Sequence, residues 1–232
     1  VSHVDLVKWF DNLRHEQGKA SRTVRDKYLA AVKSVYRLGM DKGKLTSNPA
    51  KDVRVRVVKA VQSRAKSFSD DEALRILRSA LVDPALLGGK ADNTKLAIRW
   101  VPWICAYTGA RVREIAQLRK EDLIIENGIP CLRITPEAGS EKTKEFRLVP
   151  IHQHLIETGL LELFEQAKPG PLFFRLKSPQ DDPSRRAESL SKKLAEWVRS
   201  EVGVADEGVA PNDGWRRRVR GAACGVGVGA GG

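Results

Sequence analysis

Methionine, cysteine and tyrosine are scarce in this sequence of 232 residues, which contains one, three and three of them respectively. Cys105, Cys131 and Cys224 lie far apart, so they form neither the close pairs of a zinc site nor a dense disulfide framework. No apolar stretch is long enough to cross a bilayer, and no signal peptide is recognisable. We therefore expect reduced thiols, a cytoplasmic location, no bound metal and no membrane contact.

Acidic residues are few in the first part of the chain. Residues 1–66 contain 16 Lys and Arg against 6 Asp and Glu, whereas residues 67–232 contain 25 against 23, so most of the net charge of +12 lies in the first segment. Such an excess is typical of a surface that meets a polyanion, and nucleic acid fits better than a membrane because no apolar anchor accompanies it. The alternative is a basic domain that is merely soluble.

A chain of this length can hold two modest domains. Amphipathic patterns predict helices over residues 3–16 and 21–38, with Gly39 as the expected end of the second. Residues 51–66 are rich in Lys, Arg and Val, and we interpret them as a basic linker; a strand is the alternative, because Val and Arg alternate there. Ser69 then begins a capping box, which predicts that the next helix and the second domain start close by.

The second segment mixes helical and strand patterns. Residues 94–107 predict a largely apolar helix that we expect in the core. Asn127 and Gly128 separate two strand patterns, which indicates a hairpin, and residues 145–151 predict a third strand. Further helices are predicted over residues 153–166 and 184–202.

The residues YTGARVREIAQL, from Tyr107 to Leu118, form the most informative stretch. Arg111, Glu114 and Gln117 recur at three-residue intervals, near one face of a helix that is predicted to follow a glycine turn. Free N–H groups and the helix dipole favour an anion at such a start, and a guanidinium can bind two phosphate oxygens. The same spacing is also typical of a solvated surface ion pair.

The stretch TGARVREIAQLRKEDL resembles the first arginine box of the tyrosine recombinases, the phage integrase family. The residues from Thr23 to Pro49 are similar to the helical core-binding domain that precedes the catalytic domain in that family. Lys142, Arg147 and the Leu-Val-Pro at 148–150 reproduce the spacing of the family's hairpin lysine, a later arginine and the strand that contains it. Without the resemblance, Lys142 reads as a solvated lysine in a turn.

The end of the chain departs from the family. The residues DGWR at 213–216 match the spacing of a second box, His-x-x-Arg, but Asp213 stands where the family has histidine. A carboxylate repels a phosphodiester there, whereas an imidazole can donate a hydrogen bond or carry a proton. The chain finishes in a Gly-rich composition that is unfavourable for packing, which predicts a disordered tail and a frameshifted or truncated gene. None of the three tyrosines occupies the position of the family's nucleophile: Tyr28, Tyr36 and Tyr107.

The resemblance implies a mainly α fold with two domains. A helical SAM-like core-binding domain is followed by an α+β catalytic domain for DNA breakage and rejoining, with a small three-stranded antiparallel sheet. The expected boundaries are a core-binding domain at 1–60, a basic linker at 61–68, an incomplete catalytic domain at 69–218 and a disordered tail at 219–232.

The resemblance also implies site-specific recombination and integration of double-stranded DNA through a phosphotyrosine, with no cofactor and with copies of the chain assembled on DNA. In that scheme Arg111 and Arg216 clamp the phosphate, Lys142 is the general acid, Glu114 supports the site and Asp213 replaces the histidine. We expect this chain to be inactive because the nucleophile is missing. The DNA contacts are expected from Arg22, Arg25, Lys27, Lys33, Arg54 and Arg56.

Two alternatives stay open. One is a module or regulator that derives from a recombinase and only binds DNA. The other is a metal nuclease or an unrelated DNA-binding regulator; the dispersed carboxylates disfavour the nuclease. His152 and His154 have no evident third ligand, so we interpret them as surface histidines.

Overall fold

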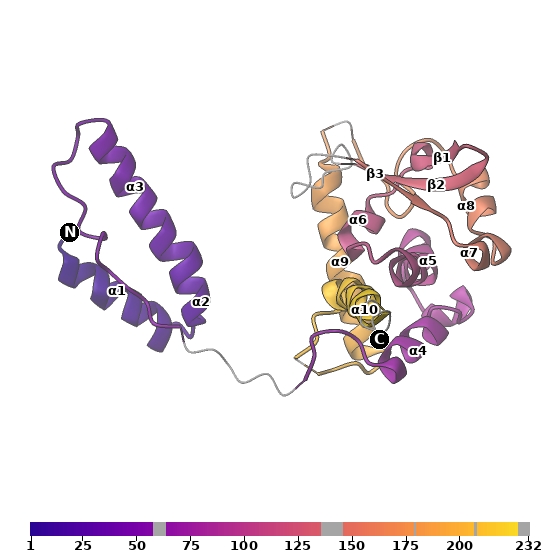
Figure 1. The fold of residues 1–232 in the computed structure, drawn as a ribbon, viewed down its shortest axis with the longest axis horizontal. Coiled ribbons are helices and arrows are strands. Elements are labelled where there is room, and N and C mark those ends of the chain that lie inside the picture. Colours follow the sequence, from indigo (N-terminus) through magenta and orange to yellow (C-terminus); the bar gives the residue numbers. More distant parts are fainter. Residues whose placement is uncertain (58–63, 136–145, 179, 207, 227–232) are drawn as a thin grey trace, which may run out of the picture. The chain divides into compact units, whose positions relative to one another are not determined.

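A computed structural model describes residues 1–57, 64–135, 146–178, 180–206 and 208–226 (Figure 1). These residues are mainly helical with a small three-stranded antiparallel sheet, which confirms that part of the expected fold class. The chain divides into two compact units, Val1–Val61 and Gln62–Gly232, each with a hydrophobic core of its own. Within the described ranges, no helix combines the length and apolarity that a bilayer crossing demands.

The first unit opens with helix α1 (His3–His15), close to its predicted bounds. Ser2 caps it: the Ser2 hydroxyl accepts a hydrogen bond from the Asp5 N–H at 3.2 Å, and the Asp5 carboxylate accepts one from the Ser2 N–H at 2.8 Å. This reciprocal capping satisfies two N–H groups that have no partner within the helix. Phe10, which is 2% exposed, anchors the apolar side of α1 in the unit's core.

The second helical stretch of this unit is continuous but not uniform. It comprises α2 (Ser21–Thr23), the π-helical turn η1 (Val24–Leu29) and α3 (Ala30–Asp41). The predicted end at Gly39 is wrong, because the helix passes through it. A Cβ atom at Gly39 would lie 2.6 Å from Cδ1 of Leu45, so the glycine permits close packing rather than ending the helix.

The π turn changes which side chains of α3 face inward. A uniform helix places Val35 in the core, yet Val35 is 68% exposed and Tyr36 packs against the core instead. A π turn contains more residues than an α turn, so the inward positions that follow it move along the chain.

Residues 51–57 belong to the first unit. Val53 and Val55 are 2% and 9% exposed in its core, while Arg54 and Arg56 between them are exposed. The alternation therefore marks a segment without regular secondary structure that covers the core, outside any strand of the described sheet. Our interpretation of 51–66 as a linker is accordingly wrong for its first part.

The second unit is built around helix α5 (Asp92–Thr108), which contributes buried residues along most of its length. The predicted capping box is confirmed at the start of α4, where the Ser69 hydroxyl accepts from the Glu72 N–H at 3.2 Å and the Glu72 carboxylate accepts from the Ser69 N–H at 2.8 Å. The short 3-10 helix η2 (Pro84–Leu87) lies between α4 and α5. The helices that pack against α5 are α4 (Asp70–Ser79), α6 (Val112–Ala116), α9 (Pro183–Ser200) and α10 (Pro211–Val226) (Figure 1).

The sheet has the strand order β1-β2-β3 with both neighbouring pairs antiparallel. Its strands are β1 (Leu123–Glu126), which follows the 3-10 helix η3 (Lys120–Asp122), then β2 (Ile129–Ile134) and β3 (Arg147–Pro150). The predicted hairpin is present: Asn127 and Gly128 have φ of 49° and 79°, as a tight turn with positive φ requires. In the β2–β3 pair, Arg147 lies opposite Ile134.

The helix predicted over 153–166 is divided in two. Helix α7 (Gln153–Glu157) ends before Gly159, whose φ of 94° interrupts the helical backbone, and α8 (Leu160–Gln166) follows. The glycine thus starts a new helix. Neither the hydrophobic period nor the composition of this stretch of sequence reveals the break.

Helix α10 differs from the expectation of a disordered tail over 219–232, because it continues through Val226. One physical reason is that residue 219 packs. A Cβ atom built on Gly109 would lie 3.0 Å from Cγ1 of Val219, so this valine sits against the turn between α5 and α6. Residues 227–232 lie outside the described residues.

Candidate functional site

Arg111 stands at a reversal of the chain between α5 and α6. Gly109 has φ of 61° and donates its N–H to the Cys105 carbonyl at 2.9 Å, which ends α5. Arg111 then takes an extended conformation as the cap of α6. The helix that we predicted to follow the glycine turn begins at Val112 and is five residues long.

Glu114 is the centre of the site and is 4% exposed. Its carboxylate accepts hydrogen bonds from the Arg111 N–H at 3.1 Å, from Arg111 Nη1 at 2.9 Å and from Arg147 Nη2 at 2.5 Å. Burial raises the pKa of Glu114, but the hydrogen bonds from Arg147 and Arg111 outweigh it and hold the pKa below its ordinary value. Glu114 is therefore an anion that two guanidinium groups share.

Arg216 reaches this site from α10, whose start is fixed by aromatic packing. Trp215 is 4% exposed and packs edge-on against Phe68, with ring centroids 5.0 Å apart. A Cβ atom at Gly214 would lie 2.5 Å from Cε2 of Phe68, so the missing side chain lets the helix approach the ring. These contacts fix the start of α10 and thereby the position of the next residue, Arg216.

The guanidinium of Arg216 is partly buried and has no ion-pair or hydrogen-bond partner among the described side chains. Burial lowers its pKa, repulsion from Arg111 and Arg147 lowers it further, and attraction to Glu114 opposes the change. Arginine stays protonated despite such shifts. Three guanidinium groups thus lie within each other's field around one carboxylate, a charge excess that an anion would neutralise.

Two residues of the expected catalytic set are not part of this cluster as described. Lys142 lies outside the described residues. Asp213 occupies the first turn of α10, where its N–H donates to the Ala210 carbonyl at 2.9 Å. Within the described part of the chain, the Asp213 carboxylate forms no ion pair.

Arg147 is the member of the cluster that our reading of the sequence did not assign to the site. The sequence contains one signal, the spacing of Arg147 after Lys142, which supports the resemblance but assigns Arg147 no role. The contact with Glu114 depends on the strand register that places Arg147 opposite Ile134, and a local pattern does not specify that register.

His152 and His154 lie at the start of α7 and take part in an aromatic cluster. The Tyr107 hydroxyl is 2.8 Å from His154 Nδ1, and the Tyr107 ring lies 4.5 Å from that of His152. Trp103 stacks on Tyr107 with centroids 6.4 Å apart. Among the described residues, no group of three or more His, Cys, Asp or Glu side chains is placed to hold a metal ion.

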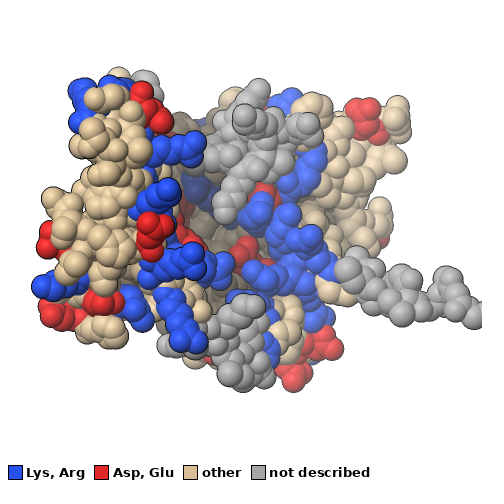
Figure 2. Space-filling view, turned by 60° about the vertical axis from the view of Figure 1, so that its left-hand side comes forward, with Lys and Arg blue, Asp and Glu red and all other residues tan. Residues whose placement is uncertain are grey.

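The basic residues of the first unit are exposed or nearly so. Arg22 and Arg25 both pair with Asp26, at 3.4 and 2.6 Å, and Lys33 Nζ donates to the Lys51 carbonyl at 3.0 Å. Exposed pairs of this kind contribute little to stability, so they leave these side chains available to another anion. In Figure 2, Lys and Arg cover more of the visible surface than Asp and Glu do. The other expected DNA contacts are also exposed: Lys27, Arg54 and Arg56.

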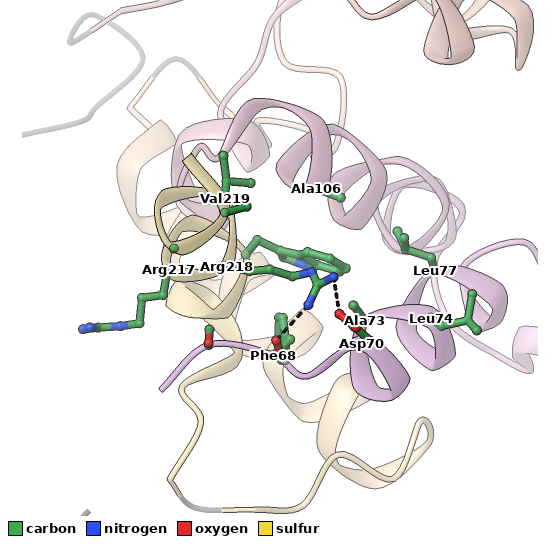
Figure 3. A pocket seen from close by; sticks show the side chains of 13 residues that line it. Phe68, Asp70, Ala73, Leu74, Leu77, Ala106, Arg217, Arg218 and Val219 are labelled. Atoms are coloured by element: carbon green, nitrogen blue, oxygen red, sulfur yellow. Dashed lines mark hydrogen bonds and ion pairs between the residues drawn. The ribbon is translucent and has the colours of Figure 1, made fainter. Parts of the chain in front are cut away.

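A separate groove of about 810 Å³ lies between α4, α5 and α10 (Figure 3). Arg218 crosses it, donating to the Phe68 carbonyl at 3.2 Å and pairing with Asp70 at 2.6 Å, while Arg217 points away. Leu74, 46% exposed, is among the apolar side chains of its lining. The described lining residues include no member of the guanidinium cluster.

The comparison with solved structures identifies the class of fold: that of the tyrosine recombinases, or phage integrases. One similar structure is a lambda integrase dimer bound to a COC′ core site, with 16% identity, a TM-score of 0.63 and coverage of 98% of this chain and 75% of that chain. A second is the XerH site-specific recombinase bound to a palindromic difH substrate in a post-cleavage complex, with 17% identity, a TM-score of 0.59 and coverage of 94% and 59%.

A third similar structure is a lambda integrase tetramer bound to a Holliday junction, with 16% identity, a TM-score of 0.63 and coverage of 94% and 58%. This chain therefore spans less than two thirds of the XerH chain and of this integrase chain. No protein-family model matches the sequence. No curated protein matches it either. Identities this low establish the fold, so function has to be argued from the site.

Proposed function

We propose that this chain is a member of the tyrosine recombinase family and that it binds double-stranded DNA, with one backbone phosphate held between Arg111 and Arg216. The observation that carries the proposal is Arg216, a partly buried guanidinium without an ion-pair partner among the described residues, in the field of Arg111 and Arg147. A buried cation surrounded by like charges is costly unless an anion joins it. A phosphodiester supplies that charge and accepts several N–H donors.

Each residue then has a role in phosphoryl transfer. Arg111 and Arg216 would bind the non-bridging oxygens and stabilise the charge that develops on a pentavalent phosphorus, where losing one such donor typically costs about 100- to 1,000-fold in rate. Glu114 would hold Arg111 in place, as its hydrogen bonds at 2.9 and 3.1 Å indicate. Lys142 would protonate the departing 5′ oxygen. Asp213, in the position of the family histidine, would weaken proton transfer and repel the phosphate.

We further propose that these 232 residues bind DNA without forming a phosphotyrosine. Tyr28 and Tyr36 pack against the core of the first unit, and the hydroxyl of Tyr107 is 2.8 Å from His154 Nδ1. The contacts described for each of the three tyrosines are thus with residues outside the guanidinium cluster. The proposed activity is therefore that of a DNA-binding module derived from a site-specific recombinase, which assembles with further copies on DNA as in the integrase dimer and tetramer complexes.

Two measurements test these statements. Fluorescence anisotropy with a short labelled duplex should show binding by the full chain that weakens in the Arg216→Ala variant. Incubation with a pool of nicked duplexes, followed by a denaturing gel, should show no adduct between protein and DNA. Binding that is indifferent to Arg216 would contradict the phosphate site, and a covalent adduct would contradict the missing nucleophile.

A further inference from the structure

Arg147 joins the strand β3 to the buried carboxylate of the site. Its Nη2 donates to Glu114 Oε2, the oxygen that also accepts the Arg111 N–H, while Arg111 Nη1 uses Oε1. The Glu114 side chain is 2% exposed, whereas that of Arg147 is 37% exposed. One edge of the Arg147 guanidinium is thus occupied by the carboxylate, and part of the side chain remains open to solvent.

The guanidinium groups around Glu114 outnumber those needed to compensate its buried carboxylate. A second buried carboxylate of the same unit, Asp122, is also shared by two arginines: Arg119 Nη2 lies 2.9 Å and Arg133 Nη2 3.7 Å from its Oδ1. That arrangement indicates that two guanidinium groups are sufficient to compensate one buried carboxylate. At Glu114 there is a third, Arg216, which both Arg111 and Arg147 repel.

Repulsion of this kind persists in a folded protein when a ligand offsets it. Glu114 offsets one of the three arginine charges, and the exposed Arg220 adds to the repulsion on Arg216, so the site keeps a positive excess. A phosphodiester carries one negative charge and a pentavalent phosphorane carries two. The positive excess of the cluster therefore favours a bound phosphate, and favours it more as negative charge develops on phosphorus.

On the basis of the proposed function, we propose that Arg147 is a third phosphate-binding residue of this site. One edge of its guanidinium holds Glu114, and the other contributes a donor and a positive charge to the same backbone phosphate that Arg111 and Arg216 bind. Strand β3, rather than a helix terminus, supplies this group.

The test measures binding of a short labelled duplex at a series of salt concentrations. Log K falls as log salt rises, and replacing a residue that contacts phosphate makes this fall shallower by about 1 unit of slope, because one fewer counterion is released. A lowered slope below means a shallower fall. Arg147→Gln should lower the slope by about 1 and weaken binding about tenfold. Arg147→Lys keeps the charge and should restore the slope while recovering only part of the affinity, because lysine has no planar fork.

Arg133→Gln is the matched control. Arg133 lies on the neighbouring strand β2, is 34% exposed and faces the other shared carboxylate, so it should leave the slope unchanged. Thermal unfolding of every variant separates loss of fold from loss of binding. If Arg147→Gln alone proves too unstable, the double variant Glu114→Gln with Arg147→Gln removes the buried carboxylate together with one of its partners and should show the same lowered slope.

The outcomes distinguish this inference from the proposed function. A slope that falls in Arg111→Ala but not in Arg147→Gln overturns the role of Arg147 and leaves the phosphate site standing. A slope unchanged in both variants overturns the phosphate site itself. A slope that falls equally in Arg147→Gln, Arg147→Lys and Arg133→Gln would mean that Arg147 acts only through the structure of the sheet.

Discussion

Arg64 forms a paired hydrogen bond with Glu72, in which Nη1 and Nη2 donate to the two carboxylate oxygens at 2.7 Å each. Glu72 is also the residue that completes the capping box of α4. The hydrogen bonds from Arg64 lower the pKa of Glu72 from 4.5 to about 2, although burial opposes the change. The segment that leads into the second unit is thereby fastened to its first helix by a carboxylate that resists protonation.

This pair predicts a pH dependence of stability. A carboxyl whose pKa is lower in the folded state stabilises the fold above its ordinary pKa and loses that contribution as pH falls through the lower value. The contribution of Glu72 should therefore be complete above pH 4.5 and disappear toward pH 2. Thermal unfolding of Glu72→Gln should show a deficit of roughly 1 to 3 kcal/mol at neutral pH that shrinks across this window. A deficit independent of pH would show that the ion pair contributes nothing.

Replacing Arg111 tests the phosphate site most directly. Arg111→Ala removes a charged donor but retains the backbone N–H that bonds Glu114. We expect affinity for a short duplex to fall about 10- to 100-fold, the range for charge-assisted hydrogen bonds, while unfolding stays cooperative. Arg185→Ala is the control, since this side chain is 88% exposed and its removal changes the net charge equally. Equal losses in the two variants would indicate that only net charge matters.

The basic side chains of the first unit should set the salt dependence of DNA binding. Lys27, Arg54 and Arg56 are exposed, and each one that neutralises a phosphate adds about 0.9 to the slope of log K against log salt. Changing all three to Gln should lower the slope by up to about 3 and leave the thermal unfolding of the chain unchanged. Titrations at several salt concentrations measure this slope, and a slope that stays at its original value would exclude these residues from the DNA surface.

Gly109 should tolerate no side chain. Gly109→Ala places a Cβ at φ of 61° and 3.0 Å from Cγ1 of Val219, so it should cost about 1 to 2 kcal/mol for the dihedral angle and more for the crowding. Gly128→Ala has φ of 79° with open space around it, so it should show the dihedral cost alone. Chemical denaturation should give a larger loss at 109 than at 128, and adding Val219→Ala should recover the difference. Equal losses at the two glycines would mean that Val219 does not press on the turn.

Features with a local cause could be predicted from the sequence. The capping box at Ser69 and Glu72 and the turn at Asn127 and Gly128 depend on residues within a few positions, and the structure contains both. The end of the second helix at Gly39 could not, because the glycine's function depends on Leu45 folding back against it.

The site shows the same division between local and distant causes. The pairing of Arg111 with Glu114 spans three residues and is visible as a spacing. The contact of Arg147 with Glu114 requires the register of β3 in the sheet, and the approach of Arg216 requires α10 to pack on Phe68. These arrangements arise from tertiary structure, which a single sequence does not encode in any short pattern.

The glycine at position 214 has a consequence for how the two ends of the second unit are connected. No side chain stands between the backbone of α10 and the ring of Phe68, because any Cβ there would lie 2.5 Å from that ring. Phe68 lies near the start of the second unit and directly precedes Ser69, the cap of α4. A displacement of the Phe68 ring would therefore act directly on α10, the helix that carries Arg216, because no side chain separates the two. The same close contact that places this arginine makes its position sensitive to any change in the size of the side chain at position 68.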